Sequence, residues 1–197
     1  MAADYDATTA LLVVDMQNDF ADPSGSLYVA GSEKIVDCVN QEIGWAADAG
    51  AAIVYTQDWH PPSTPHFAKD GGVWPVHCVG GTWGAEPHPA LRLVPGADVV
   101  RKGTGGEDGY SAFSVRQPTT GEEAGTGLED ILRARGVTRV VIVGLATDYC
   151  VKETGLDARR LGFEATVVTD AVGAVDLRPG DGERALQAVQ AAGVTLV

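Results

Sequence analysis

Short apolar runs alternate along the chain with segments whose apolar residues recur at helical spacing. Runs dominated by apolar residues predict buried strands, and they lie at residues 10–14, 51–55 and 140–143, with shorter or weaker ones at 165–169, 194–197 and 98–100. Apolar residues three and four positions apart predict helices that begin near residues 32, 128, 150 and 182. Ser32 is expected to cap the first helix, and a glycine follows each of the other three.

This alternation predicts a three-layer α/β/α fold with a mostly parallel, roughly six-stranded sheet, formed by residues 1–197 as one domain. In such sheets, functional groups gather beyond the carboxyl ends of the strands. The stretch from Gln57 to Pro95 breaks the alternation, because it is rich in Pro, His, Trp and Gly and has no clear period. Its aromatic residues argue against disorder, so we interpret it as a functional loop excursion.

Charge and cysteine content narrow the class of protein. The 14 Lys and Arg residues against 27 Asp and Glu give a net charge of −13, which disfavours nucleic acid and anionic membranes as partners. Three cysteines are too few for a disulfide framework and favour a cytoplasmic location. We find no signal peptide and no apolar segment long enough to span a bilayer.

Three side chains that could carry chemistry each follow a predicted strand. Asp15 follows the first run, and its commoner role at such a position is to cap a turn. Lys102 follows the weak run at 98–100, where it could be a solvated surface residue or could hold a neighbouring acid ionised. Cys150 follows the run at 140–143 and is either a buried structural cysteine or a nucleophile whose pKa is lowered by a helix N-terminus.

A second group of polar side chains lies in the loop excursion. One carboxylate and several imidazoles suit Zn²⁺, Fe²⁺ or Mn²⁺, and the group comprises Asp58, His60, His66 and His77. The alternative is a polar loop with scattered histidines. Cys78 is a possible further ligand but is expected to pack, and Cys38 and His88 are interpreted as structural. No nucleotide cofactor is expected, because Asp108 replaces the third glycine of a dinucleotide fingerprint.

Five motifs resemble, in order, those of the nicotinamidases in the isochorismatase-like cysteine hydrolase family. They are VVDMQNDF around Asp15, TQDWHPP around Asp58, WPVHC at Trp74, KG at Lys102 and GLATDYCV around Cys150. The resemblance spans nearly the whole chain. It implies that this protein hydrolyses an amide, nicotinamide and also pyrazinamide, and that it binds one divalent metal ion.

The resemblance also implies roles for individual residues. It implies a catalytic triad of Asp15, Lys102 and Cys150, and an oxyanion hole from the backbone N–H groups of Ala146 and Cys150. The implied metal ligands are Asp58, His60 and His77, with His66 as a further ligand. The implied pocket for the substrate ring consists of Phe20, Trp74 and Tyr110. It further implies a cis peptide bond between Leu145 and Ala146. One departure is a glycine-rich stretch, residues 103–110, that is about one residue longer than in close relatives, which affects the position of Tyr110.

The resemblance leaves other functions to be weighed. Another cysteine amidohydrolase of the family could act on a carbamoyl or maleamate-type substrate, but several of those lack the metal motif. Isochorismatase itself does not need the cysteine. A metal-bound hydroxide could replace the thiolate as nucleophile, and a non-catalytic binding protein could share the fold. Besides a small-molecule amide, a partner could be a second copy of the chain in a homo-oligomer.

Overall fold

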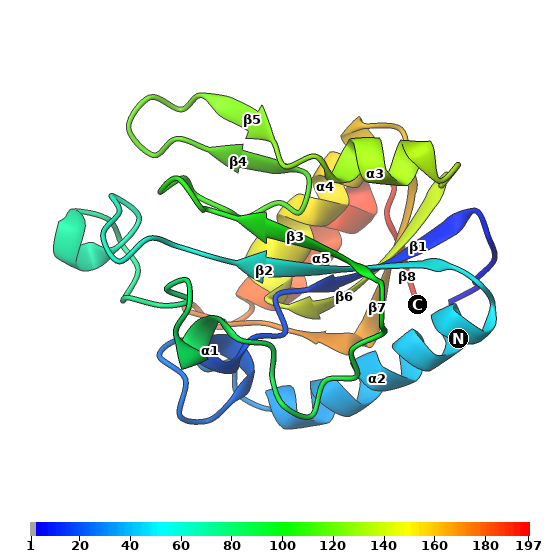
Figure 1. Ribbon diagram of the computed structural model, residues 1–197, viewed down its shortest axis with the longest axis horizontal. Coiled ribbons are helices and arrows are strands. Elements are labelled where there is room, and N and C mark those ends of the chain that lie inside the picture. Colours follow the sequence, from blue (N-terminus) through cyan, green and yellow to red (C-terminus); the bar gives the residue numbers. More distant parts are fainter. Residues whose placement is uncertain (1–2) are drawn as a thin grey trace.

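Six parallel strands form the centre of the computed structural model, which describes residues 3–197. The strands are β1 (Thr9–Val14), β2 (Ala52–Asp58), β3 (Asp98–Lys102), β6 (Arg139–Leu145), β7 (Glu164–Gly173) and β8 (Thr195–Leu196). Their order in the sheet is β3-β2-β1-β6-β7-β8, and each neighbouring pair is parallel (Figure 1). The predicted sheet is therefore confirmed in its strand number and direction.

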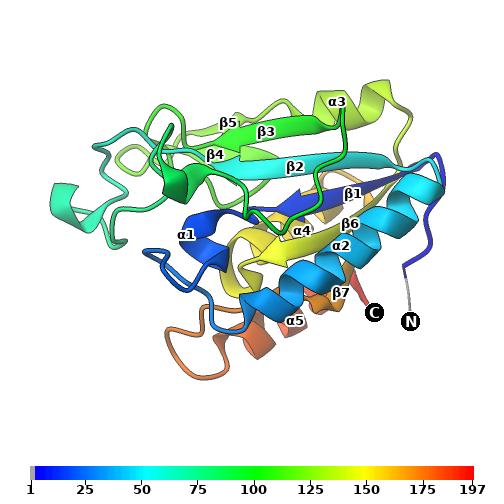
Figure 2. The same cartoon turned by 60° about the horizontal axis from the view of Figure 1, so that its bottom comes forward.

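Helices cover both faces of this sheet, as the predicted three-layer arrangement requires. Alternate residues of β1 point to opposite faces, so that Leu11 and Val13 pack beneath α2 (Ser32–Asp48), whereas Leu12 packs with the helices of the other face. Those helices are α3 (Leu128–Ala134), α4 (Lys152–Arg160) and α5 (Asp181–Ala191) (Figure 2). Burial on both faces explains why the strands are continuous apolar runs.

The loop excursion between β2 and β3 is folded, although it contains little regular structure. It holds two 3₁₀ turns, η1 (Ala68–Asp70) and η2 (Trp83–Ala85), and isolated bridges join His60 to Val79 and Phe67 to Trp74. Phe67 is fully buried. Figure 1 shows the first part of this stretch, which includes η1, projecting beyond the end of β2, whereas its last part runs back to the start of β3. The first part therefore lies at the sheet edge where the sequence predicts a site.

Several details of the elements differ from the sequence-based expectations. Ser32 does not cap its helix: Gly31 occupies the cap position, and the buried Ser32 hydroxyl donates instead to the carbonyl of Ala21, the last residue of α1 (Asn18–Ala21). The helix expected at Cys150 begins earlier, as a π-helical turn η3 (Thr147–Val151) that continues into α4. A small hairpin of β4 (Ser114–Arg116) and β5 (Glu123–Gly125) was not expected. Within residues 3–197, no helix is long and apolar enough to cross a membrane.

Candidate active site and metal-binding site

An ion pair between Asp15 and Lys102 lies at the carboxyl edge of the sheet. Asp15 follows β1 with a left-handed backbone, φ 47°, and Lys102 ends β3. Lys102 Nζ lies 2.6 Å from Asp15 Oδ2, and both side chains are fully buried. The hydroxyl of Thr56 donates to Asp15 Oδ1 at 2.6 Å, so both carboxylate oxygens are engaged. The two residues that the sequence singled out separately are therefore a directly bonded pair.

Burial and charge oppose each other in this pair. Burial raises the pKa of the Asp15 carboxyl above its usual value, against the lowering effect of the Lys102 ammonium. Burial alone would lower the pKa of Lys102, but the nearby Asp15 carboxylate raises it above its ordinary value. Lys102 is thus held as an ammonium, and Asp15 has an increased affinity for a proton.

Cys150 lies in η3, directly beyond the end of β6. Burial raises the pKa of its thiol well above the usual value, with Lys102 lowering it and Asp15 raising it. The sequence predicts a pKa lowered by a helix N-terminus, whereas burial raises the pKa of this thiol. A thiol beside a carboxylate of increased proton affinity is an arrangement suited to general-base activation of a nucleophile. The peptide bond Leu145–Ala146, just before η3, is cis, as expected.

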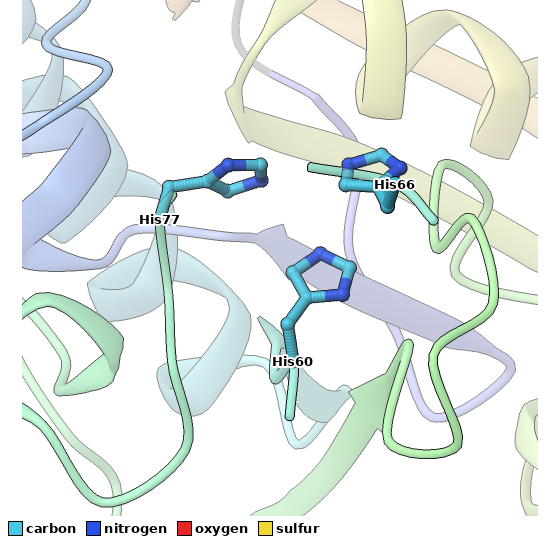
Figure 3. A group of neighbouring side chains, drawn as sticks. All are labelled: His60, His66 and His77. Atoms are coloured by element: carbon cyan, nitrogen blue, oxygen red, sulfur yellow. The ribbon is translucent and has the colours of Figure 1, made fainter. Parts of the chain in front are cut away.

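Three imidazoles converge beside this group. His60, His66 and His77 are buried, and each offers a ligand atom within 4.8 Å of the others (Figure 3). Asp58, the last residue of β2, contacts two of them: its Oδ2 lies 3.1 Å from His60 Nε2 and 3.3 Å from His77 Nε2. The structure thus brings all four predicted ligands together, His66 included.

The donor set at these imidazoles fits a divalent metal ion. Among the described residues, Asp58 Oδ1 and His60 Nδ1 are buried atoms without a hydrogen-bond partner. Unpaired buried polar atoms are costly, and a cation coordinated by the carboxylate would compensate part of that cost. Three imidazoles with one carboxylate suit several divalent first-row metals, zinc among them, so the donor set does not select one.

One pocket joins the cysteine to the imidazoles. Its lining includes Cys150, Ala146, His66 and His77 together with the predicted aromatic residues Phe20, Trp74 and Tyr110. The Trp74 indole N–H donates to the Tyr110 hydroxyl at 2.8 Å, so the longer glycine-rich stretch still delivers Tyr110 to the pocket. The walls are largely apolar, which suits a small uncharged ring.

Comparison with known proteins places this arrangement in a family. Residues 9–197 match the isochorismatase domain. The chain belongs to the isochorismatase family. It is 39% identical to the nicotinamidase of Escherichia coli strain K12, over 95% of this chain and 93% of that protein.

Solved structures of the isochorismatase family share the fold over nearly their whole length. The pyrazinamidase of Pyrococcus horikoshii in complex with zinc superposes with a TM-score of 0.86 and 42% identity, covering 96% of this chain and 98% of that chain. PnC1 from L. infantum in complex with nicotinate gives a TM-score of 0.88 at 35% identity, covering 100% and 96%.

Other residues of this isochorismatase-family chain stand apart from the site or were missed. Cys78 is buried, with its Sγ 3.8 Å from the carbonyl oxygen of Gly84, and packs as expected. Leu27, Tyr149 and Val175 also line the pocket but were not predicted. Tyr149 adjoins Cys150, which is a signal that could have found it. Leu27 and Val175 come from separate loops and carry no sequence signal of their own.

Proposed function

We propose that this protein is an amidohydrolase that converts nicotinamide to nicotinic acid and ammonia, and that it also hydrolyses pyrazinamide. The observation that carries the proposal is one pocket lined by Cys150 and by two imidazoles of the three-histidine cluster, with the buried Asp15–Lys102 pair close enough to affect the thiol. The similarity to a nicotinamidase, to a pyrazinamidase and to a protein solved in complex with nicotinate supports an aromatic amide as the substrate. The proposal extends to a single domain of residues 1–197 and to a cytoplasmic location, which the three free cysteines support.

The proposed reaction is covalent catalysis by Cys150. Asp15 accepts the thiol proton, and the thiolate attacks the carboxamide carbon. The backbone N–H groups of Ala146 and Cys150 stabilise the oxyanion. Asp15 returns the proton to the departing ammonia, which leaves a thioester on Cys150. Water, deprotonated by Asp15, then releases nicotinic acid and restores the thiol.

Lys102 and the imidazole cluster have supporting roles in this proposal. Lys102 lowers the pKa of Asp15 against the effect of burial and so favours the ionised form that acts as the base. Asp58, His60, His66 and His77 would hold one divalent ion, zinc, iron or manganese. A bound ion would supply a Lewis acid for the pyridine nitrogen, which would help to orient the ring. Phe20, Trp74 and Tyr110 would hold the ring between them, so that the carboxamide carbon faces Cys150.

Replacing the nucleophile tests the mechanism directly. We expect Cys150→Ala to reduce the rate of ammonia release from nicotinamide by at least about 10³-fold, while the metal content stays near that of the wild type. Cys38→Ala is the matched control, because Cys38 is a half-buried residue of α2 away from the pocket. Retained turnover in Cys150→Ala, lost on chelation, would show that a metal-bound hydroxide is the nucleophile.

Substrate comparison separates this function from that of other family amidohydrolases. The pocket walls contain Phe20, Trp74 and Tyr110, which suit a flat ring. We therefore expect kcat/KM for nicotinamide to exceed that for maleamate or a carbamoyl amide. The reverse order of kcat/KM would assign the protein to that second substrate class.

A further inference from the structure

One carboxylate of the glycine-rich stretch, residues 103–110, contacts a histidine of the candidate metal-binding site. Asp108 Oδ1 lies 2.5 Å from His66 Nδ1. The His66 side chain is almost fully buried, and that of Asp108 is 23% exposed. Asp108 is not a member of the triad, is not one of the four candidate ligands and does not line the pocket. Its contact with His66 is therefore a feature that the proposed reaction leaves unexplained.

The contact fixes which nitrogen of His66 can bind a metal. A carboxylate only accepts hydrogen bonds, so a neutral His66 that binds a metal has its proton on Nδ1 and offers the lone pair of Nε2. A carboxylate on the far nitrogen also makes an imidazole a better donor and holds its ring in place. Within the described part of the chain, the other two histidines have no carboxylate on the nitrogen that faces away from the site. His77 Nδ1 contacts the backbone carbonyl of Pro75, and His60 Nδ1 has no partner among residues 3–197.

Asp108 is itself held by the backbone. Its N–H donates to the carbonyl of Arg116 at 2.7 Å, and the Arg116 N–H donates back at 3.0 Å, which ties it to strand β4. The next residue, Gly109, accepts a hydrogen bond from Lys102 Nζ. A Cβ on Gly109 would lie 2.8 Å from Lys102 Cβ and 2.9 Å from Asp58 Oδ1, so only glycine allows this approach. Two adjacent residues thus contact His66 on one side and Lys102 on the other.

We propose that Asp108 is a positioning residue of the metal centre, which orients His66 and its lone pair and thereby increases the affinity of the site for a divalent ion. The inference rests on the metal site of the proposed function. It concerns metal binding alone, so it is tested without reference to amide hydrolysis.

Metal affinity of substituted proteins tests this inference. Metal-free wild type, Asp108→Ala and Asp108→Asn are titrated with Zn²⁺ against a chromophoric chelator, and with Co²⁺ by its d–d absorption. We expect the dissociation constant to rise about 10-fold for Asp108→Asn, which keeps an acceptor without the charge, and up to about 100-fold for Asp108→Ala. The Co²⁺ spectrum of Asp108→Ala should also change, because His66 no longer has a fixed orientation.

Glu107→Ala is the matched control. Glu107 is the preceding carboxylate of the same loop, and its contacts are with the Gly105 N–H and the Gln117 side chain, so the change removes the same charge without touching a histidine. We expect its Zn²⁺ affinity to stay within about twofold of the wild type. Thermal unfolding of the metal-free proteins checks that each variant folds. If Asp108→Ala does not fold, the isosteric Asp108→Asn decides the question.

Unchanged Zn²⁺ affinity in the folded Asp108 variants would overturn the inference, as would an equal loss in Glu107→Ala or a wild type that binds no divalent ion. The fate of the proposed function is separate. A wild type that fails to hydrolyse nicotinamide, but whose metal affinity depends on Asp108, refutes the function and supports the inference. If the wild type hydrolyses nicotinamide but the Asp108 variants bind Zn²⁺ as tightly as it does, the function is supported and the inference is refuted.

Discussion

Asp15 and Lys102 form an ion pair with no exposure to solvent. Taking two charges out of water is expensive, and their mutual attraction compensates only while both partners are present. The pair is therefore not expected to add much to the free energy of unfolding. Its position beside Cys150 gives it a more direct explanation, as a base and the counter-charge that favours its ionised form in the proposed reaction.

Substitution of Lys102 should reveal the free-energy cost of burying the charge of Asp15. We expect Lys102→Met to abolish hydrolysis and to lower the free energy of unfolding by about 3–5 kcal/mol, because Asp15 is left buried without its counter-charge. Urea denaturation measures the loss. In the double variant Asp15→Asn with Lys102→Met, most of the stability should return without activity. If the double variant loses as much stability as the sum of the two single changes, the two charges are not coupled.

Individual site residues differ in how far the sequence predicts them. Asp15, Lys102 and Cys150 each follow an apolar run, so strand ends alone place them at one edge of the sheet. The contact between Asp108 and His66 could not be predicted. It joins residues 42 positions apart through a glycine-rich loop whose course depends on Gly109 fitting against Lys102 and Asp58.

Strand β6 approaches β1 closely just before the cis peptide. Gly144 has φ 108°, and a Cβ at this position would lie 2.1 Å from the carbonyl oxygen of Val14, its partner in the parallel pairing. The glycine therefore allows the end of β6 to lie against β1 immediately before the chain turns into η3. This close approach places Cys150 near the residue that follows Val14, which is Asp15.

Replacing this glycine should be far more damaging than replacing a glycine in open space. We expect Gly144→Ala to lower the free energy of unfolding by at least about 3 kcal/mol, because the strand pair must separate. Gly136→Ala is the control, since Gly136 also has positive φ, 71°, but a Cβ there meets nothing within 4 Å. It should cost about 1–2 kcal/mol, the penalty for a left-handed alanine. Similar midpoints of urea unfolding for both variants would contradict the steric argument.

At the level of elements, burial separates what the sequence predicts from what it does not. The strands at 10–14 and 140–143 are predicted closely because they are buried on both faces. The hairpin of β4 and β5 was missed, because Glu123–Gly125 is exposed throughout and Ser114–Arg116 is at most half-buried, so neither strand carries an apolar pattern. The π-helical start at Thr147 was also missed, since no residue pattern distinguishes it from an ordinary helix.

The whole molecule places four strand ends side by side. In the order β3-β2-β1-β6, these ends present Lys102, Asp58, Asp15 and the turn that carries Cys150. The excursion then folds His60, His66 and His77 against the same edge. The candidate metal site and the triad thus share one edge of the sheet, although Asp15 and Cys150 are 135 positions apart in the sequence.

Metal binding by this face should stabilise the whole fold. A ligand at 100 times its dissociation constant adds about 2.7 kcal/mol, which for a chain of this size raises Tm by about 5–10 °C. We expect chelation to lower Tm by that amount and Zn²⁺ to restore it, as followed by circular dichroism. His77→Ala should remove the response to Zn²⁺, whereas His88→Ala, outside the cluster, should retain it. A Tm indifferent to both chelator and Zn²⁺ would contradict a metal site.

The position of Trp74 in the pocket wall has an optical consequence. Of the four tryptophans, Trp74 lines the pocket and is 8% exposed, whereas Trp45 and Trp83 are exposed and Trp59 stacks against the guanidinium of Arg101. An aromatic ring that enters the pocket meets this indole directly and alters its surroundings. The protein therefore carries a built-in fluorophore at its binding site, so occupancy can be followed through intrinsic emission, without a label and without turnover.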